Sequence, residues 1–548
     1  MLEGARFSAR RFFLGAADSI VTMPLLRWTW TGLADAAFAG ELPELRPSDR
    51  EVVRDMMVGR YLLASKLVET GGASPFDVEV DHAEWFQNLH GFSWLRHFRE
   101  LRDPGERQFA RMLVLDWIGH EGRFEHESWT LILCAQRVLN WLRHLPLLLD
   151  GATQEQSRTI QRSLGMQIQS LRVRERLARD PVDRLFAAMA LVGGELCDQD
   201  DRTDIDRRLV RLNTLLAEQI DREGLHVSRN PKLQLQLLVD LASIRRAVSG
   251  LKTEASSELA AQVARMHESL DALTLGSGEP AYFNGCGQLP HDVLIAVQAD
   301  GTGRKPKSQL LGGYGTLREG AAVVVADSGL VPPVDFAGEA HSSALAFEFS
   351  HGTELIVGSC GPAPASLPDA KALFRQGVAH SAPTIDAEDA EPVPVRGAFA
   401  GRLIEVGPPP HLELDTAENV LTLATAGYAD RFGVDIERRM TLLPDGTTLV
   451  GQDRMVANGT ETGEGVLSVR FHLAPGVLVE RNRGDSVVRL ALPKGGLWTF
   501  LWEGADFHDE ESVRQSPHIG FHKTRQLVLE TPVRPGAEIS WVFTREQG

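Results

Sequence analysis

The stretch "ALAFEFSHGTELIVGS", residues 344–359, first alternates between apolar and polar residues and then runs apolar. The stretches "AAVVVADSG", "ERRMTLLPDGTTLVGQDRM" and "LSVRFHLAPGVLVERNRGDSVVRLAL" have the same texture, with "PDG" and "RGD" as turns. This pattern is typical of antiparallel β-sheet, and there is enough of it for a large two-layer sandwich. We therefore predict a β-sandwich domain over residues 301–548.

The chain before this region has a helical apolar period. Ile205, Leu209, Leu212, Leu216 and Ile220 recur at three- and four-residue steps, which is one face of an amphipathic helix. Similar patterns fill residues 51–70, 106–119, 129–149, 157–178, 184–197, 233–247 and 256–274. The sequence thus predicts an α+β multidomain protein whose helical domain covers residues 1–300.

Composition limits the classes of function. The chain has 548 residues, of which 43% are hydrophobic and 24% charged, as in an ordinary globular protein of two large domains. Its net charge of −17 argues against nucleic acid as a partner, because phosphate contacts need a basic face. The four cysteines form no CxxC pair and are expected to be free thiols. No apolar run is long enough for a transmembrane segment.

The N-terminal stretch "ARRFFLG", residues 9–15, is similar to a twin-arginine export signal, which would imply a periplasmic protein. The residues that follow include Asp18 and Arg27 and lack a clean apolar core. A cytoplasmic location is therefore the expectation, with the periplasm as the alternative.

Several separated stretches, in this order, resemble landmarks of the heparinase II/III-like family. In the helical half they are "LHGFSWLRHF", "SWTLILCAQRVLNWLRHLP", "GLHVSRNP" and "YFNGCGQ". In the second half they are "GGYGTLREG", "EAHSSALAFEFSHG", "AHSAPTID", "GYADRFGVDIERRMTL", "RFHLAPGV" and "LWTF". The resemblance implies an incomplete α/α toroid followed by a C-terminal antiparallel β-sandwich, and the known enzymes of the family are polysaccharide lyases.

Lyases of this kind would cleave a uronate-containing polymer by β-elimination. The carboxylate next to the reacting carbon must be neutralised by Asn, Arg, His or a metal. A Tyr or His must then remove the proton, and an acid must protonate the leaving oxygen.

The resemblance also implies a metal site. In active relatives the "LAFEF" strand begins with His-x-His-Ala-Asp, which places Glu339 at the first histidine, facing the substrate, and His341 at the second, a zinc ligand. His380 matches the other sandwich histidine, whereas a third ligand falls on Gly358 or Ser359, neither of which is a good zinc ligand. We expect either one divalent metal such as zinc at His341 and His380 or a hydrogen-bonded structural pair. Glu339 is a candidate base or ligand, and an ion pair with a neighbouring Arg is its alternative role.

The family's catalytic Tyr-His pair is absent. Active relatives place it shortly after a Ser-Pro, where "SRNPKLQL" has Leu233 and Gln234. The upstream Asn of relatives falls near Pro181–Asp183, which contains no Asn.

Candidate residues that would replace the absent catalytic pair lie close together in "GLHVSRNP". His226, Arg229 and Asn230 are residue types that can serve as base, carboxylate clamp and neutraliser. Asn230 precedes a Pro, so ordinary helix capping is the alternative.

Candidates for substrate binding are side chains on which a sugar can stack or to which it can hydrogen-bond. They are His90, Trp94, Trp129, Arg137, Asn140, Trp141, Tyr282 and Asn284. Arg137 and Trp141 are four residues apart on a predicted helix and share a face. Tryptophans at helical spacing are more often core residues, which is the alternative here.

The first functional hypothesis is a lyase that cleaves an acidic polysaccharide or oligosaccharide, with His226, Arg229, Asn230, Glu339 and His341 as catalytic residues. The second is a non-catalytic carbohydrate-binding or envelope-assembly protein that keeps the fold. The partner would be the acidic glycan, and a homodimer is compatible with the sequence. Hydrolysis is a third hypothesis, for which Glu223 and Glu339 are the candidate carboxylate pair.

Overall fold

The computed structural model describes residues 2–31, 37–122, 124, 127–199, 204–364, 367–459, 462–481, 487–516 and 518–546. The chain divides into two compact units. The first, here the helical unit, comprises Met1–Gln219, Gln236–Ala264 and Asp292–Asp300. The second, here the sheet unit, comprises Ile220–Leu235, Arg265–His291 and Gly301–Gly548, so it includes two segments from the first 300 residues.

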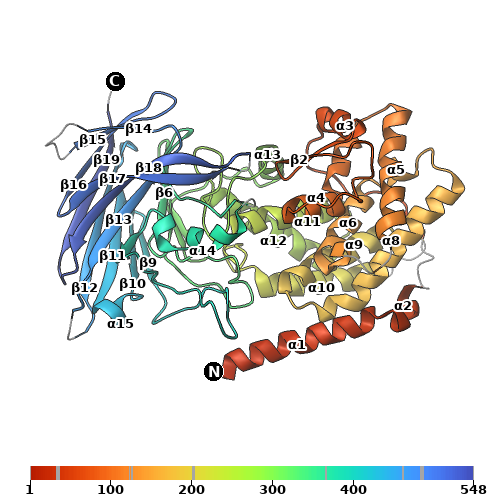
Figure 1. The fold of residues 1–548 in the computed structure, drawn as a ribbon, viewed down its shortest axis with the longest axis horizontal. Coiled ribbons are helices and arrows are strands. Elements are labelled where there is room, and N and C mark those ends of the chain that lie inside the picture. The colour runs from red at the N-terminus through yellow and green to blue at the C-terminus, as the bar shows by residue number, and fades with distance from the viewer. Residues whose placement is uncertain are drawn as a thin grey trace. The chain divides into compact units, whose positions relative to one another are not determined.

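Helices dominate the first 300 residues (Figure 1). The α-helices are α1 (Leu2–Thr22), α2 (Pro24–Thr31), α3 (Arg50–Met57), α4 (Ala83–Gly91), α5 (Pro104–Glu121), α6 (Leu131–Arg143), α7 (Leu145–Leu149), α8 (Gln154–Arg174), α9 (Pro181–Cys197), α10 (Ile205–Gln219), α11 (Pro231–Ala247), α12 (Glu254–Ala272) and α13 (His291–Ala299). Short 3₁₀ helices are η1 (Ser93–Phe98), η2 (Glu127–Trp129) and η3 (Glu175–Leu177).

The apolar period predicts α10 correctly. Leu209, Leu212 and Leu216 are all fully buried, as one face of an amphipathic helix should be. Other helices begin at residues that satisfy their free amides, such as Thr153, whose side chain and that of Gln156 form a reciprocal capping box at the start of α8.

The prediction of helix over residues 51–70 is wrong in its second half. After α3 the chain forms a two-stranded antiparallel hairpin of β1 (Arg60–Leu63) and β2 (Lys66–Glu69). Ala64 and Ser65 connect the strands with φ angles of 46° and 60°. Two consecutive left-handed residues form the tight turn that matches the twist of a hairpin, and they end any helix.

The sheet unit contains two large antiparallel sheets (Figure 1). One has the order β14-β15-β16-β19-β12-β11-β10-β9, and the other β17-β18-β13-β7-β6-β5-β4-β3, with β8 paired to β13. The strands are β3 (Gln309–Leu311), β4 (Tyr314–Glu319), β5 (Ala322–Asp327), β6 (Phe347–His351), β7 (Glu354–Gly358), β8 (Pro383–Ile385), β9 (His411–Asp415), β10 (Val420–Thr425), β11 (Val434–Leu442), β12 (Thr448–Ala457), β13 (Val466–Leu473), β14 (Leu478–Glu480), β15 (Val487–Ala491), β16 (Leu497–Glu503), β17 (Asp506–Ser516), β18 (Gly520–Pro532) and β19 (Glu538–Arg545). The smaller helices are η4 (Pro368–Ala370), α14 (Lys371–Phe374), η5 (Gly377–Ala379) and α15 (Ala429–Phe432).

One hydrophobic core lies between the two sheets. Phe347 of β6 stacks on Trp541 of β19, with ring centroids 5.3 Å apart and an interplanar angle of 8°. Along β11, buried and less buried residues alternate, as expected for a strand with one face on a core. The predicted fold class, a helical region followed by antiparallel sheets, is confirmed.

An ion pair sits inside this core. Arg438 of β11 donates from Nε to Asp453 Oδ1 at 2.7 Å and from Nη2 to Oδ2 at 3.0 Å, and both side chains are fully buried. The remaining nitrogen of Arg438 donates to the Leu345 and Ser381 carbonyls. Trp541 Nε1 also donates to Asp453, so the buried charges are fully hydrogen-bonded.

The segments from the first 300 residues contribute a second, smaller core in the sheet unit. Leu225 and Phe283 pack with Tyr314 of β4 and with Val323 and Val325 of β5. This packing places the loops around residues 226 and 284 against the same strands.

All four cysteines are buried free thiols, as predicted. No described helix combines the length and apolar character that crossing a membrane would need.

Candidate functional site

The loop "GLHVSRNP" turns sharply before α11. Arg229 has a left-handed φ of 60°, and its amide donates to the His226 carbonyl at 2.8 Å. His226 is fully buried; its Nδ1 lies 2.8 Å from Ser228 Oγ, and its ring packs edge-on against Phe336. Burial lowers the pKa of His226 to about 3, so its ring is neutral at physiological pH.

Gln234 fixes this loop from the inside. Its Nε2 lies within hydrogen-bond distance of the Gly224 carbonyl (2.8 Å), the Met266 carbonyl (3.0 Å) and Ser269 Oγ (3.0 Å). Its Oε1 accepts from the His226 amide at 3.0 Å. The amide is fully buried and saturated, at one of the two positions where the family resemblance expects catalytic side chains.

Asn230 has the role of a helix cap. Its Oδ1 accepts from the Lys232 amide at 2.9 Å, which satisfies one of the free donors at the start of α11.

The Arg229 side chain points into the sheet unit and is almost fully buried. Its Nε donates to the Gly312 carbonyl at 2.7 Å, one Nη to the Leu330 carbonyl, and the other to Asp327 Oδ1 at 2.6 Å. The guanidinium also lies 4.2 Å from the Tyr314 ring centroid. Burial disfavours its charge, but Asp327 outweighs this effect and raises the pKa of Arg229. All three nitrogens are therefore bonded to the protein itself.

Asp327, at the end of β5, is the centre of a buried polar cluster. Its Oδ1 accepts from Arg229 and from the Gly329 amide (2.8 Å), and its Oδ2 accepts from Ser343 Oγ (2.8 Å) and Asn284 Nδ2 (3.3 Å). The side chain is completely buried. Four hydrogen-bond donors thus converge on one buried carboxylate.

Tyr314 and Asn284 extend this cluster. Tyr314 Oη donates to the Arg229 carbonyl at 2.6 Å and accepts from Asn284 Nδ2 at 2.7 Å. Burial raises the pKa of Tyr314, so the phenol keeps its proton. Asn284 is itself left-handed, with φ 51°, and its Oδ1 accepts from the His341 amide at 3.1 Å.

The two candidate metal ligands bond to each other. His341 Nδ1 and His380 Nε2 are 3.1 Å apart, so one imidazole donates to the other. Burial, and for His341 also the neighbouring His380, lowers both pKa values, to about 3 for His380. His380 Nδ1 has no hydrogen-bond partner among the described residues.

These residues do not complete a zinc site. Catalytic zinc is held by three protein ligands, and the third position of relatives falls on Gly358 or Ser359. Within the part of the chain that the structure describes, no group of three His, Cys, Asp or Glu side chains is placed to hold a metal ion.

Glu339 lies outside the buried cluster. It is exposed and forms an ion pair with Lys371 Nζ at 2.6 Å, with a Lys in place of the expected Arg. Tyr282 is buried, donates to Glu279 Oε2 at 2.8 Å and lies 3.8 Å beneath the Arg514 guanidinium.

The aromatic candidates of the helical unit are core residues. Trp94, Trp129 and Trp141 are at most 2% exposed, and Arg137 is fully buried with its guanidinium 4.1 Å from the Trp117 ring. Arg137 donates to Gln167 Oε1 at 2.7 Å and to the carbonyls of His90 and Ser128. A buried ring has no free face on which a sugar could stack.

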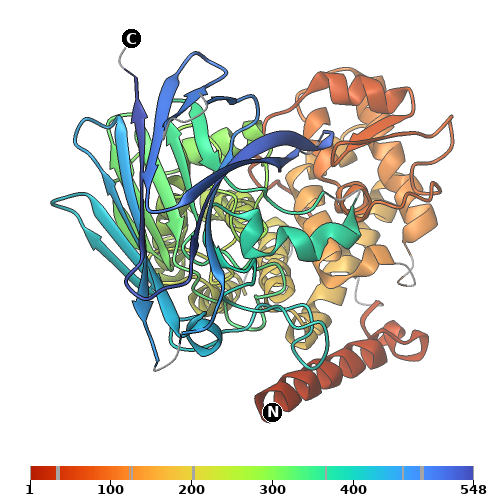
Figure 2. The ribbon, with the colours of Figure 1, turned by 60° about the vertical axis from the view of Figure 1, so that its left-hand side comes forward.

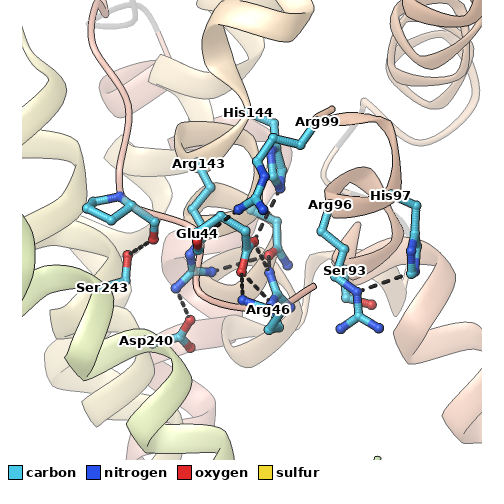
Figure 3. Close-up of polar contacts among 12 residues, drawn as sticks. Glu44, Arg46, Ser93, Arg96, His97, Arg99, Arg143, His144, Asp240 and Ser243 are labelled. Atoms are coloured by element: carbon cyan, nitrogen blue, oxygen red, sulfur yellow. Dashed lines mark hydrogen bonds and ion pairs between the residues drawn. The ribbon is translucent and has the colours of Figure 1, made fainter. Parts of the chain in front are cut away.

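Figure 3 shows a polar cluster of the helical unit in which Arg46 and Arg143 surround Glu44. Asn140 belongs to this cluster through its hydrogen bond with Arg46. Arg46 contacts Glu44 through two nitrogens, at 2.8 and 2.6 Å, and donates to Asn140 Oδ1 at 2.8 Å. Arg143 also donates to Asn140 and pairs with Asp240. The cluster connects α6 and α11 to the segment before α3, so its side chains stabilise the packing of these three segments.

His90 lines a pocket of about 530 Å³ in the helical unit. Its Nδ1 accepts from Trp117 Nε1 at 3.1 Å. The same pocket is lined by Asp77, Glu79, Asp81 and Glu121. Four carboxylates would repel an acidic glycan.

A second pocket, of about 630 Å³, lies in the sheet unit beside His472. His472 Nε2 lies 3.0 Å from the Val378 carbonyl, and its Nδ1 lies 2.6 Å from Ser512 Oγ. The carbonyl takes the ring proton, so Nδ1 is the acceptor for the Ser512 hydroxyl. Cys360 Sγ lies 3.7 Å from the same nitrogen.

The sequence reasoning did not single out Tyr314, Asp327 or Glu391. Glu391 is buried beside Ser342, whose Oγ is 3.4 Å from its Oε2, and burial followed by the charge of Asp327 raises the pKa of Glu391 to about 8. The sequence position of Asp327 could have predicted its role. It ends the apolar run "AAVVVAD", where a buried carboxylate costs free energy unless it has hydrogen-bond partners.

Comparison with known proteins agrees with this fold. Residues 301–542 match the family model described as Heparinase II/III-like, C-terminal. A solved structure of heparinase III is similar over 96% of this chain and 90% of its own, with a TM-score of 0.71 and 13% identity. A heparan sulfate lyase from Pedobacter heparinus is similar over 95% of this chain and 88% of its own, with a TM-score of 0.60 and 16% identity.

A curated relative, FtsZ-localized protein C of Caulobacter vibrioides (strain NA1000 / CB15N), is 25% identical over 531 residues, which are 92% of this chain and 90% of the relative. The fold that the resemblance implied, a toroid followed by a β-sandwich, is confirmed by the heparinase III structure. The C-terminal domain of this chain, over residues 301–542, belongs to the heparinase II/III-like family.

Proposed function

We propose that this protein keeps the lyase fold without lyase chemistry and acts in envelope assembly at a division site marked by FtsZ. The observation that carries the proposal is Gln234. Where active relatives have a catalytic Tyr-His pair, this chain has Leu233 and Gln234, and the Gln234 amide is saturated by internal hydrogen bonds.

The other candidate groups support the same proposal. Arg229 would be the carboxylate clamp, yet each of its nitrogens donates to the protein. A uronate would have to replace Asp327 and two carbonyls as its partners, which would leave those acceptors buried and unpaired. The proposed location at FtsZ rests on the FtsZ-localized relative, which matches nearly the whole chain.

A fluorescent fusion in cells of the source organism tests the setting. We expect the fusion to form a midcell band that disappears when FtsZ is depleted. A uniform distribution in dividing cells would contradict the proposal.

A polysaccharide lyase acting on a uronate-containing glycan is the second candidate. Arg229, Asn284, Tyr314 and His341 are residue types that β-elimination requires, and they share one buried cluster. Ultraviolet absorbance during incubation with uronate polymers and oligomers, with and without added divalent metal, separates the two functions. We expect no increase; an increase that is lost in His341→Ala and Tyr314→Phe, with the fold retained, would establish the lyase instead.

A further inference from the structure

Large exposed apolar side chains gather at the N-terminal helices. Phe12 and Phe13 of α1 are 70% and 68% exposed, and Leu25 of α2 is 83% exposed. Ile20 and Met23 are also exposed. Both ribbon views show α1, in red, at the outer edge of the helical unit (Figures 1 and 2). Several large apolar side chains exposed on two consecutive helices are typical of an interaction surface.

α1 exposes large apolar side chains in addition to those on its inner side, where Phe7, Leu14 and Val21 are half-buried. The exposed positions Ala5, Ala9 and Phe12 follow each other at helical spacing, Phe13 lies beside Phe12, and the exposed Ile20 lies two turns further along the helix. A helix of a soluble protein normally turns its apolar face to the core and its polar face to water.

Polar contacts hold the opposite face of α1 on the helical unit. Asp18 accepts from the Arg174 guanidinium at 2.7 and 3.1 Å, and Arg11 donates to the Arg179 carbonyl at 3.3 Å. Gly15 packs so closely that a Cβ there would overlap the Arg179 guanidinium. Arg11, Gly15 and Asp18 lie on one side of the helix, so these contacts fix its rotation and keep the aromatic face outward.

The exposed side of α1 carries more basic than acidic charge, because Arg6 and Arg10 outnumber the exposed Glu3. Arg6 and Arg10 are exposed and four residues apart, and Phe13 lies one turn beyond Arg10. Asp18, an acidic residue of the same helix, is paired with Arg174. The rest of the chain is acidic, with an overall net charge of −17, so this basic and apolar face stands out from it.

We infer that α1 binds the surface of a membrane that contains anionic lipids, with Phe12, Phe13 and Ile20 in the acyl boundary and Arg6 and Arg10 at the headgroups. Amphipathic helices with arginine at the edge of an aromatic face lie in the membrane interface in this way. The charges within α1 make it a helix that lies on the bilayer rather than one that crosses it. This surface is independent of the proposed function and would serve an active lyase equally.

Sedimentation of the full-length protein with vesicles tests the inference. We expect binding to vesicles of phosphatidylglycerol and phosphatidylcholine, weaker binding to phosphatidylcholine alone, and loss of binding as salt increases. Phe12→Ser with Phe13→Ser should lower the affinity by at least about tenfold, because two aromatic side chains no longer leave water. Arg6→Glu with Arg10→Glu should abolish the preference for anionic vesicles.

Val395→Ser is the matched control, since Val395 is 92% exposed but lies in the sheet unit, and it should leave vesicle binding unchanged. The replaced side chains are exposed, and circular dichroism will verify that every variant is folded. Absence of wild-type binding to anionic vesicles, or equal binding by the double Phe variant, would overturn the inference. If light scattering instead shows a wild-type dimer that the Phe substitutions dissociate, without vesicle binding, a second copy of the chain covers this face.

Discussion

Arg229 Nη2 lies 2.6 Å from Asp327 Oδ1, and the two side chains are only 4% and 0% exposed. The pair links the loop before α11 to the end of β5, and around it converge Tyr314, Asn284 and Ser343. The groups that would carry out an elimination reaction are thus the groups that hold the sheet unit together.

Asp327→Asn should lower the free energy of unfolding by about 3–5 kcal/mol, because it leaves the Arg229 charge buried without its counter-ion. Urea unfolding followed by circular dichroism measures the change. Glu339→Gln, which breaks the exposed pair with Lys371, is the matched control and should cost less than about 1 kcal/mol. Equal costs for the two variants would contradict the structural role of Asp327.

Arg438 and Asp453 allow a test inside the sandwich core. Arg438→Met alone should cost about 3–5 kcal/mol, since it strands the Asp453 carboxylate in the core. Adding Asp453→Leu should recover part of that loss, because no buried charge remains. A double-mutant cycle measures the coupling, and strictly additive losses would show that the pair does not act as a unit.

Glu391 should make stability depend on pH. Burial and Asp327 raise its pKa from 4.5 to about 8, so the folded protein holds a proton that the unfolded chain releases. The contribution of Glu391 to the free energy of unfolding is fully present below about pH 4.5 and is lost as the pH rises towards 8. Over this range, the free energy of unfolding falls by at most about 1.4 kcal/mol per pH unit because of this group.

Unfolding at a series of pH values compares the wild-type protein with Glu391→Gln. Between pH 5 and 8 the variant should lack the Glu391 contribution to the slope, whereas the contributions of Asp183 and of the buried histidines should remain. Glu339→Gln, at an exposed position, should retain the wild-type slope. A Glu391→Gln protein with the wild-type pH dependence would contradict the assignment.

Treatment with a chelator should leave the unfolding temperature unchanged, because His341 and His380 lack a third ligand. Differential scanning calorimetry with and without added zinc provides the measurement. A temperature increase with zinc that His380→Ala abolishes would show that a ligand outside the expected set completes the site.

Local pattern was sufficient for the fold class. The spacing of Leu209, Leu212 and Leu216 predicts the buried face of α10, and alternation predicts β11. These patterns reflect helical and strand periods, which are properties of neighbouring residues. The hairpin at residues 60–69 was wrongly predicted as helix because its short apolar runs fit both a helical and a strand period. Only the left-handed backbone of Ala64 and Ser65 distinguishes the hairpin from a helix.

The sequence by itself determined which chemical groups the candidate site contains, including Arg229, Asn284 and His341, and that the family's Tyr-His pair is replaced by Leu233 and Gln234. Tertiary structure alone decided how those groups are used. Asp327 reaches Arg229 and Asn284 from a distant strand, and burial removes all three from solvent. Likewise, "ARRFFLG" fixes the composition of α1, but the contact of Asp18 with Arg174 decides that its aromatic face points outward. Such pairings depend on the packing of segments far apart in the chain, which no local pattern encodes.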